Sequence, residues 1–407
     1  MQALDVGVGH RVRLAKGHAH DGQRLTAHGM FLMHTPRVMA APNPASVAIV
    51  MDGSETGSGA CLFLASTPLH TFFALGLMAG PMRQAPKHLW LIDQPPGARD
   101  YLAEALEQST AIDVKVARCA ALRGIASARA KLHEMSAEAA RIAPATIAVG
   151  MDHRLEFYAA LRGCPQASRL YIDDGLYSYL PHQHATAPWL EVLTNWRRSL
   201  KYGLPVERPA LVGGSKAVQS GFVLLPGQVH AGLAGKSVRA LQPEWFATDV
   251  VRRTCIRAAA LAGFDAAGCA GLGLLMLLPH PRFLQSDPAL KEQLARLVRS
   301  HTERGQTVAL KSHPNAAQPA HQQLGLPEAP CIEVPARLPA EVLAPMLDKT
   351  VVVGTLTTAL LSLSLLGHGL RVFRLPSAVA TVSAFEAGAQ RVYDAAGVQV
   401  FDAVQVA

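Results

Sequence analysis

The sequence predicts an α/β protein made of two Rossmann-like domains that face each other across a cleft. Two observations lead to this prediction: short apolar runs typical of buried strands alternate with helical segments, and the alternation occurs in both halves of the chain. At 407 residues the chain is long enough for each half to bury its own core. Such alternation implies mainly parallel sheets covered by helices on both faces.

The composition is that of a folded, basic protein. Apolar residues make up 50% and charged residues 17%, which excludes disorder for most of the chain. The formal net charge of +8 and a pI near 9.3 favour anionic partners. Six cysteines with no C-x-x-C pair exclude a disulfide framework or a clustered zinc site and fit a reducing compartment.

Three regions follow from the patterning. Residues 1–58 are rich in Gly, Ala, Pro and His, lack a signal-like apolar core, and are expected to form a disordered extension. We place the first Rossmann-like domain at 59–215 and the second at 216–407.

The first domain opens with a β-prone run at Cys61–Ala65. Thr67 is a good helix N-cap and Pro68 suits a first helical turn, so we expect a buried strand, a tight turn and a helix. The uncharged stretch 61–82 is long enough to raise a transmembrane helix as the alternative, which the proline opposes.

The remaining elements alternate regularly. In the first half we expect strands at 88–93, 112–117, 146–150 and 170–172, with helices at 100–108, 122–141 and after 151. In the second half we expect strands at 222–225, 273–278, 307–310 and 331–334, a helix at 288–302, and a strand, hydroxyl-rich turn and helix within 351–361.

Two adjacent carboxylates stand at the end of a predicted strand. Leu170–Ile172 is β-prone, and Gly175 stops it with a residue free to adopt a positive φ. Asp173 and Asp174 therefore lie where an open α/β sheet usually binds ligands. A turn with two solvated aspartates is the alternative.

The second half carries polar residues at comparable positions: His313, Pro314, Thr355, Thr357 and Thr358. Hydroxyls and N–H groups at a helix N-terminus suit an anion, although helix capping and an ordinary His-Pro loop explain the same residues. The sequence has neither a P-loop nor a convincing dinucleotide fingerprint.

The order acidic-acidic-Gly, His-Pro and Ser/Thr resembles bacterial sialyltransferases of the polysialyltransferase and lipooligosaccharide sialyltransferase groups. Ser66–Leu69 also looks like that family's first strand–helix junction, with His70 in place of an expected glutamine. Gly150–Arg154 is similar to its Gly-Asn-Asp-Arg-Arg segment, although Met151 departs from it. These likenesses imply the GT-B glycosyltransferase architecture.

The resemblance also implies roles. One carboxylate takes the proton of the acceptor hydroxyl, and we favour Asp173, with Asp174 holding the loop. His313, when protonated, offsets the charge of the departing phosphate without a metal. We expect the second domain to bind the donor and the first the acceptor. Further donor contacts are expected from Gly175, Pro314, Thr355, Thr357, Thr358, Glu341 and His280, and acceptor contacts from Thr67, Asp152, Arg154 and Arg197.

Several of these residues have a second interpretation. Glu341 either accepts hydrogen bonds from ribose hydroxyls or caps a helix, and His280 either lines the cleft or is structural. Arg197 belongs to a basic segment, 190–202, that faces an anionic acceptor, inner-leaflet lipid, or only solvent. The paired aspartates could hold a divalent metal, as in GT-A transferases, but no third ligand is evident.

The prediction is therefore an inverting glycosyltransferase that uses a CMP-activated sugar, CMP-sialic acid by resemblance, and an anionic surface glycan acceptor. We expect no metal, no other cofactor and no nucleic acid partner. A CMP-Kdo transferase and a catalytically silent nucleotide- or glycan-binding protein are the alternatives. We expect a cytoplasmic protein attached to the inner face of the inner membrane and released by salt.

Overall fold

The structure is a computed structural model that describes residues 59–401, apart from 96, 181–187, 329 and 377–383. The described residues belong to one compact unit, 53–407. The extension predicted at 1–58 lies outside the described residues.

Seven parallel strands form the first sheet, in the order β3-β2-β1-β4-β5-β6-β7. They are β1 (Cys61–Ala65), β2 (Lys87–Gln94), β3 (Val114–Ala120), β4 (Thr146–Val149), β5 (Ser168–Ile172), β6 (Ser220–Val223) and β7 (Ser237–Ala240). The segments between them form α1 (Pro68–Ala79), α2 (Tyr101–Glu107), α3 (Ile125–Ile142), α4 (Leu155–Gly163), the 3-10 helix η1 (Gly175–Ser178), α5 (Pro188–Tyr202), η2 (Pro226–Gln228) and α6 (Ala231–Ala234).

Six parallel strands form the second sheet, in the order β10-β9-β8-β11-β12-β13. They are β8 (Leu272–Leu277), β9 (Thr307–Lys311), β10 (Cys331–Val334), β11 (Val351–Gly354), β12 (Arg371–Arg374) and β13 (Gln399–Val400). The other helices are α7 (Pro243–Phe246), α8 (Asp249–Leu261), η3 (Ala266–Cys269), α9 (Pro281–Ser286), α10 (Pro288–Glu303), α11 (Ala320–Leu324), η4 (Ala340–Met346), α12 (Thr358–Leu366) and α13 (Ala384–Ala395).

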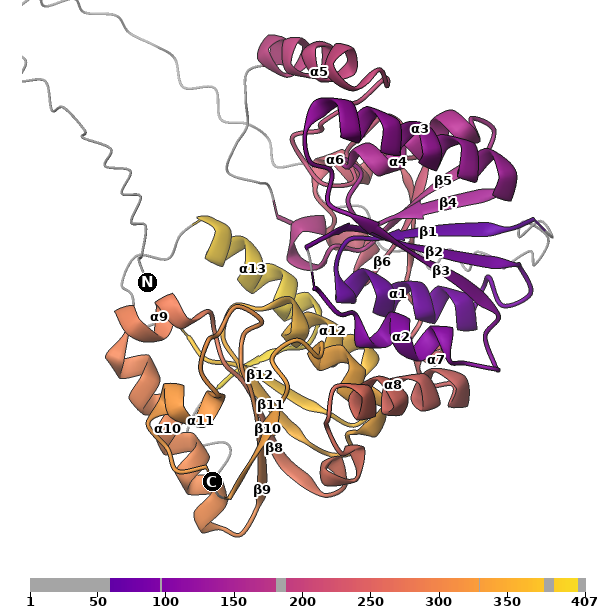
Figure 1. Ribbon diagram of the computed structural model, residues 1–407. Helices are drawn as coiled ribbons and strands as arrows, with labels where there is room; N and C mark the ends of the chain where they lie inside the picture. Colours follow the sequence, from indigo (N-terminus) through magenta and orange to yellow (C-terminus); the bar gives the residue numbers. More distant parts are fainter. Residues whose placement is uncertain (1–58, 96, 181–187, 329, 377–383, 402–407) are drawn as a thin grey trace, which may run out of the picture. The chain divides into compact units, whose positions relative to one another are not determined.

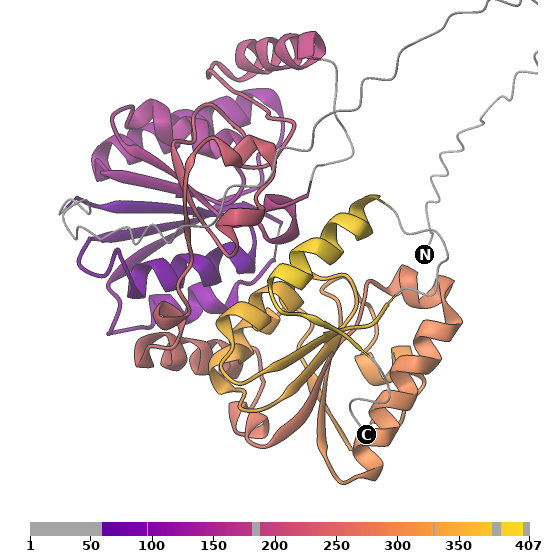
Figure 2. The ribbon, with the colours of Figure 1, turned by 180° about the vertical axis from the view of Figure 1, so that it is seen from behind.

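Helices cover both faces of each sheet. In the first sheet α3 and α4 lie on one face and α1 and α2 on the other (Figure 1). Viewed from behind, the second sheet is likewise enclosed between α12 and α10 (Figure 2). Strand β1 is buried along its whole length: Phe63 packs into one core cluster, while Leu62 and Leu64 pack into another. This burial on both faces explains why such strands read as unbroken apolar runs.

The prediction of two α/β domains, each built on a parallel sheet, is confirmed. The strand at 61–65 and the helix after it are present as β1 and α1, with Thr67 as N-cap and Pro68 in the first turn. Within the described part of the chain, no helix combines the length and apolar character that crossing a membrane requires.

One strand that was predicted for the second domain belongs to the first sheet. The apolar run at 222–225 was predicted to open the second domain, but β6 (Ser220–Val223) pairs with β5, and β7 pairs with β6 in turn. An apolar run shows that a strand is buried without showing which sheet it joins. The first sheet therefore extends well beyond residue 215, up to Ala240.

Gly76 allows α1 to lie directly against α7. The glycine is buried, and a Cβ there would overlap the Phe246 ring, which stacks on Phe72 at a centroid distance of 5.0 Å. At Gly235, in contrast, an added Cβ would meet no atom within 4 Å.

We predict that Gly76→Ala lowers the free energy of unfolding by about 1–3 kcal/mol, because overpacking outweighs the gain in helix propensity. Urea denaturation measures the change, with Gly235→Ala as the matched control that stays close to the wild type. A stabilised Gly76→Ala protein would show that Phe246 moves aside freely.

Candidate active site

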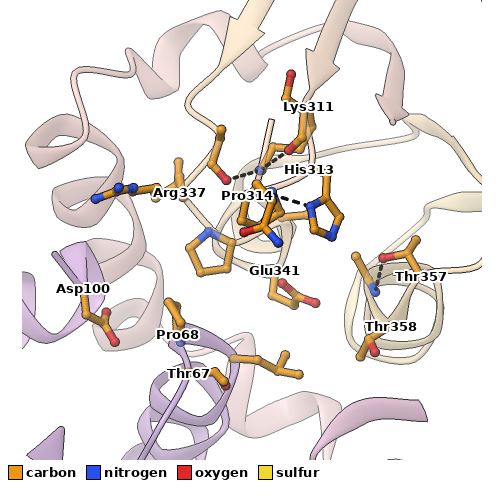
Figure 3. A pocket seen from close by; sticks show the side chains of 18 of the residues that line it. Thr67, Pro68, Asp100, Lys311, His313, Pro314, Arg337, Glu341, Thr357 and Thr358 are labelled. Carbon is orange, nitrogen blue, oxygen red and sulfur yellow. Dashed lines mark hydrogen bonds between the residues drawn. The ribbon is translucent and has the colours of Figure 1, made fainter. Parts of the chain in front are cut away.

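A cavity of about 570 Å³ opens at the carboxyl ends of strands from both sheets. The first sheet contributes the turn from β1 to α1 and the loop after β2, and the second contributes the ends of β8 and β9, the start of η4 and the start of α12. Figure 3 labels ten of the lining residues: Thr67, Pro68, Asp100, Lys311, His313, Pro314, Arg337, Glu341, Thr357 and Thr358. Open α/β sheets bind ligands at this edge.

The end of β9 supplies two nitrogen groups to the cavity. Lys311 is buried, its ammonium group donates to the carbonyls of Ser312 (2.9 Å) and Ala336 (2.7 Å), and burial lowers its pKa to about 8. His313 accepts a hydrogen bond at Nδ1 from the Asn315 N–H (3.1 Å), so its Nε2 carries the proton. His313 thus presents an N–H donor even when the ring is neutral.

The pKa of His313 is lowered by burial and then by the nearby His280 and Lys311. The two imidazole rings lie edge to face at 4.8 Å. The ring is therefore mostly neutral at pH 7, whereas the sequence-based prediction used its protonated form. A bound anion would raise this pKa again.

Glu341 lies in the wall of the cavity and does not cap a helix. Its side chain accepts a hydrogen bond from the Ser362 hydroxyl (2.7 Å), and η4 has no side-chain cap. Burial raises the pKa of this carboxyl group. The helix-capping interpretation of Glu341 is therefore wrong, and the carboxyl group remains a candidate partner for ligand hydroxyls.

The start of α12 is fixed by two threonines. Thr357 is the N-cap and accepts from the Ala359 N–H (3.4 Å), while its backbone N–H and carbonyl both bond the Tyr393 hydroxyl (2.9 Å each). The Thr358 hydroxyl accepts from the Leu176 N–H (3.3 Å). Capping, the alternative role for Thr357, is confirmed, and both threonines still line the cavity.

Asp173 is fully buried and saturated with hydrogen bonds. One oxygen accepts from the Gly175 N–H and the Ser178 hydroxyl (2.7 Å each), and the other accepts from the Leu224 N–H (2.7 Å) and the Tyr179 hydroxyl. Burial raises its pKa to about 6 despite these donors. No lone pair faces a ligand, so the geometry disagrees with Asp173 as the base and fits a structural carboxylate.

Asp174 differs from its neighbour. Its Oδ1 accepts from His70 Nε2 (2.8 Å), whereas its Oδ2 has no partner among the described residues. Its backbone N–H is held by the hydroxyls of Tyr171 (3.2 Å) and Ser178 (3.0 Å). The loop also lies against α12, since Gly175 adopts a φ of +70° and a Cβ there would overlap Thr358.

Neither aspartate lines the cavity as described, and several other predicted residues lie outside it too. Asp152 is buried and accepts from the N–H groups of Gly213 (2.9 Å) and Ser215 (2.8 Å), which makes it structural. Arg154 pairs with Asp93. His280 caps α9 by accepting from Arg282 N–H (3.2 Å). Thr355 is half-buried beyond the lining.

Arg197 lies on the exposed side of α5, away from the cavity lining. The same helix exposes the apolar side chains of Leu190, Val192, Trp196 and Leu200. The solvated-face interpretation of this basic segment thus agrees with its exposure.

Sequence reasoning did not predict several polar lining residues, among them Ser66, Arg99, Lys311 and Arg337. The position of Lys311 in the sequence could have identified it. The lysine ends a buried strand shortly before a His-Pro pair, and burying an unpaired charge costs free energy, so a lysine in such a place suggests a functional role. In the described part of the chain no group of three or more His, Cys, Asp or Glu side chains could hold a metal ion.

No family model matches the sequence, and no curated protein matches it either. Among solved structures, an alpha/beta-galactoside alpha-2,3-sialyltransferase from Photobacterium phosphoreum is 10% identical, with 84% of this chain and 97% of that chain covered and a TM-score of 0.47. The UDP-GlcNAc 2-epimerase from Methanocaldococcus jannaschii is 9% identical, with coverages of 83% and 92% and a TM-score of 0.47. MurG from Acinetobacter baumannii is 12% identical, with coverages of 84% and 86% and a TM-score of 0.40.

The two adjacent aspartates should respond differently to the same substitution. Asp173→Asn should lower the free energy of unfolding by about 1–3 kcal/mol, because an amide N–H₂ would face N–H or O–H donors. Asp174→Asn keeps an oxygen for His70 and should stay within about 0.5 kcal/mol of the wild type. Chemical denaturation measures the free energy of unfolding of both variants. Equal losses of stability would contradict the assignment of a structural role to Asp173 alone.

Proposed function

We propose that this protein is an inverting, metal-independent glycosyltransferase that moves sialic acid, or a related nonulosonic acid, from a CMP-linked donor to an anionic surface glycan. The observation that carries the proposal is the convergence of His313, Glu341 and the N-terminus of α12 in one cavity of a GT-B fold. The choice of CMP and of the sugar rests on the motif resemblance described above.

The donor side of the cavity suits a nucleoside monophosphate leaving group. The Nε2–H of His313 and the N-terminus of α12 can both donate to a phosphate. Glu341, anchored by Ser362, suits ribose hydroxyls because a carboxylate accepts their hydrogen bonds. These groups stabilise the charge that develops on the phosphate as the glycosidic bond breaks.

The acceptor side requires a base for the attacking hydroxyl. We assign this role to Asp174 in place of Asp173: both oxygens of Asp173 are occupied by donors, whereas Asp174 bonds His70 through Oδ1 and its buried Oδ2 has no hydrogen-bond partner among the described residues. Asp173 then holds the loop through its four donors. Base and leaving-group stabiliser come from different sheets, as a single displacement between two bound substrates requires.

The two sides should separate in binding and turnover. Asp174→Asn should abolish CMP release from CMP-sialic acid yet keep CMP affinity within a few-fold, because the lost interaction belongs to the transition state. His313→Ala should weaken CMP binding by about 1.5–3 kcal/mol and also slow turnover. Calorimetric titration with CMP tests both variants, with the exposed His368→Ala as the control.

If Asp174→Asn lost CMP affinity while His313→Ala kept it, the donor would bind to the first domain, and the assignment of the donor to the second domain would be wrong. A wild-type protein that binds CMP but never releases it from a CMP-sugar would favour the silent binding protein.

Turnover should persist in EDTA. His313 and the start of α12 are proposed to supply the charge stabilisation that Mg²⁺ supplies in metal-dependent transferases. CMP release is measured before and after chelation, with added Mg²⁺ as the control. Activity that disappears in EDTA and returns with Mg²⁺ or Mn²⁺ would contradict the metal-independent proposal.

A further inference from the structure

Three side chains form one hydrogen-bonded chain beside the cavity, two from the β1–α1 junction and one from the loop after β5. Ser66 Oγ lies 3.1 Å from His70 Nδ1, and His70 Nε2 lies 2.8 Å from Asp174 Oδ1. Ser66 lines the cavity, the imidazole is completely buried, and the carboxylate lies behind it. The chain therefore connects the cavity wall to the carboxylate that does not reach the wall itself.

The hydrogen bonds fix the tautomer of His70. The backbone N–H of Ser66 also points at Nδ1, at 3.4 Å, and an N–H can only donate. Nδ1 therefore holds the lone pair, and Nε2 carries the proton that it donates to Asp174. A basic nitrogen thus faces the serine hydroxyl and a carboxylate orients the ring from behind, the arrangement of a Ser-His-Asp triad.

The local sequence builds this arrangement. Thr67 caps α1 by accepting from the His70 N–H (3.3 Å), which sets the first helical turn directly after β1. Ser66 and His70 are four residues apart, so their side chains meet on one face. The ring then crosses the end of β4, where Gly150 provides space that a Cβ would fill.

We propose that His70 takes the acceptor's proton by way of Ser66 while Asp174 orients the ring and stabilises its charge, so that the catalytic base is a relay of three residues. This inference rests on the proposed function and deepens it. Ser66 is the group that touches the acceptor hydroxyl, while His70 and Asp174 act through it.

The proton transfers balance. The acceptor hydroxyl gives its proton to Ser66 Oγ as its oxygen attacks the anomeric carbon, and Ser66 gives its own proton to His70 Nδ1. His70 becomes an imidazolium, and its Nε2–H stays hydrogen-bonded to Asp174 Oδ1, whose carboxylate stabilises the positive charge without taking the proton. The bond between the sugar and the phosphate breaks, and CMP leaves with the electron pair of that bond.

His70→Gln is the discriminating variant, because an amide keeps both hydrogen bonds but cannot take up the proton. With CMP-N-acetylneuraminic acid as donor and water as acceptor, we expect CMP release to fall by about 10²-fold or more, with CMP affinity unchanged within twofold. The rate of CMP release should fall similarly in Ser66→Ala. In Ser66→Thr, which keeps a hydroxyl, much of that rate should be recovered. The exposed His133→Gln is the matched control and should behave as the wild type.

The tautomer of His70 is a readout that is independent of the rate. Histidine ¹⁵N NMR, with the His70 signal assigned by its loss in His70→Gln, should show the Nε2–H tautomer. An Nδ1–H tautomer, or a His70→Gln protein with the wild-type rate, would overturn the relay.

A last pair of outcomes concerns Ser66 and the donor. Mass spectrometry of the protein incubated with the same donor should show no sugar on Ser66; a glycosylated Ser66 would overturn the relay in favour of double displacement. If the wild-type protein neither binds CMP nor releases it, the proposed function fails and the relay falls with it. If CMP release is normal and does not change when His70 or Ser66 is substituted, the relay is wrong but the proposed function stands.

Discussion

The buried carboxylate of Asp173 is the interaction on which the geometry of the candidate site depends. Its four donors come from the loop after β5 and from the end of β6, so one side chain ties two neighbouring strand ends together. None of these donors is charged. The cost of burying an ion is met by hydrogen bonds alone, and for that reason the pKa of Asp173 stays above its usual range.

This network also determines what Asp174 can do. Ser178 donates to Asp173 through a hydroxyl that in turn accepts from the Asp174 N–H, so the structural residue and the candidate base share one positioning group. The backbone N–H of Asp174 is held by two hydroxyls, and among the described residues its side chain is hydrogen-bonded to His70. Preorganisation of this kind is what a catalytic group needs, since the cost of ordering it is met during folding.

Much of the fold could be predicted from the sequence, because buried parallel strands are apolar throughout and helix starts carry recognisable caps. The β1–α1 junction, with Thr67 and Pro68, is an example. The sheet that receives β6 could not be predicted, since strand pairing depends on residues far apart in the chain. For the site, the His-Pro and Ser/Thr motifs lie in the cavity lining, whereas the paired aspartates do not.

Asp173 and Asp174 show why the roles of the site residues could not be predicted from the sequence. The residues are adjacent and chemically identical, and they differ only in what surrounds them: Leu224, which saturates the first, lies 51 positions away, and His70, which engages the second, lies 104 positions away. Spacing within a motif carries no information about such partners. The unexpected histidine in the first strand–helix junction was the one local clue, and the structure gives it a partner.

Gly150 carries a consequence for how this chain can vary. Because the imidazole of His70 occupies the space where a Cβ would lie, the two positions form a single unit of substitution. A larger residue at 150 is compatible only with a different side chain, or a different side-chain direction, at position 70. Among related chains, a glycine at the end of β4 should therefore accompany the histidine, and its replacement should mark lineages in which Asp174 has another partner.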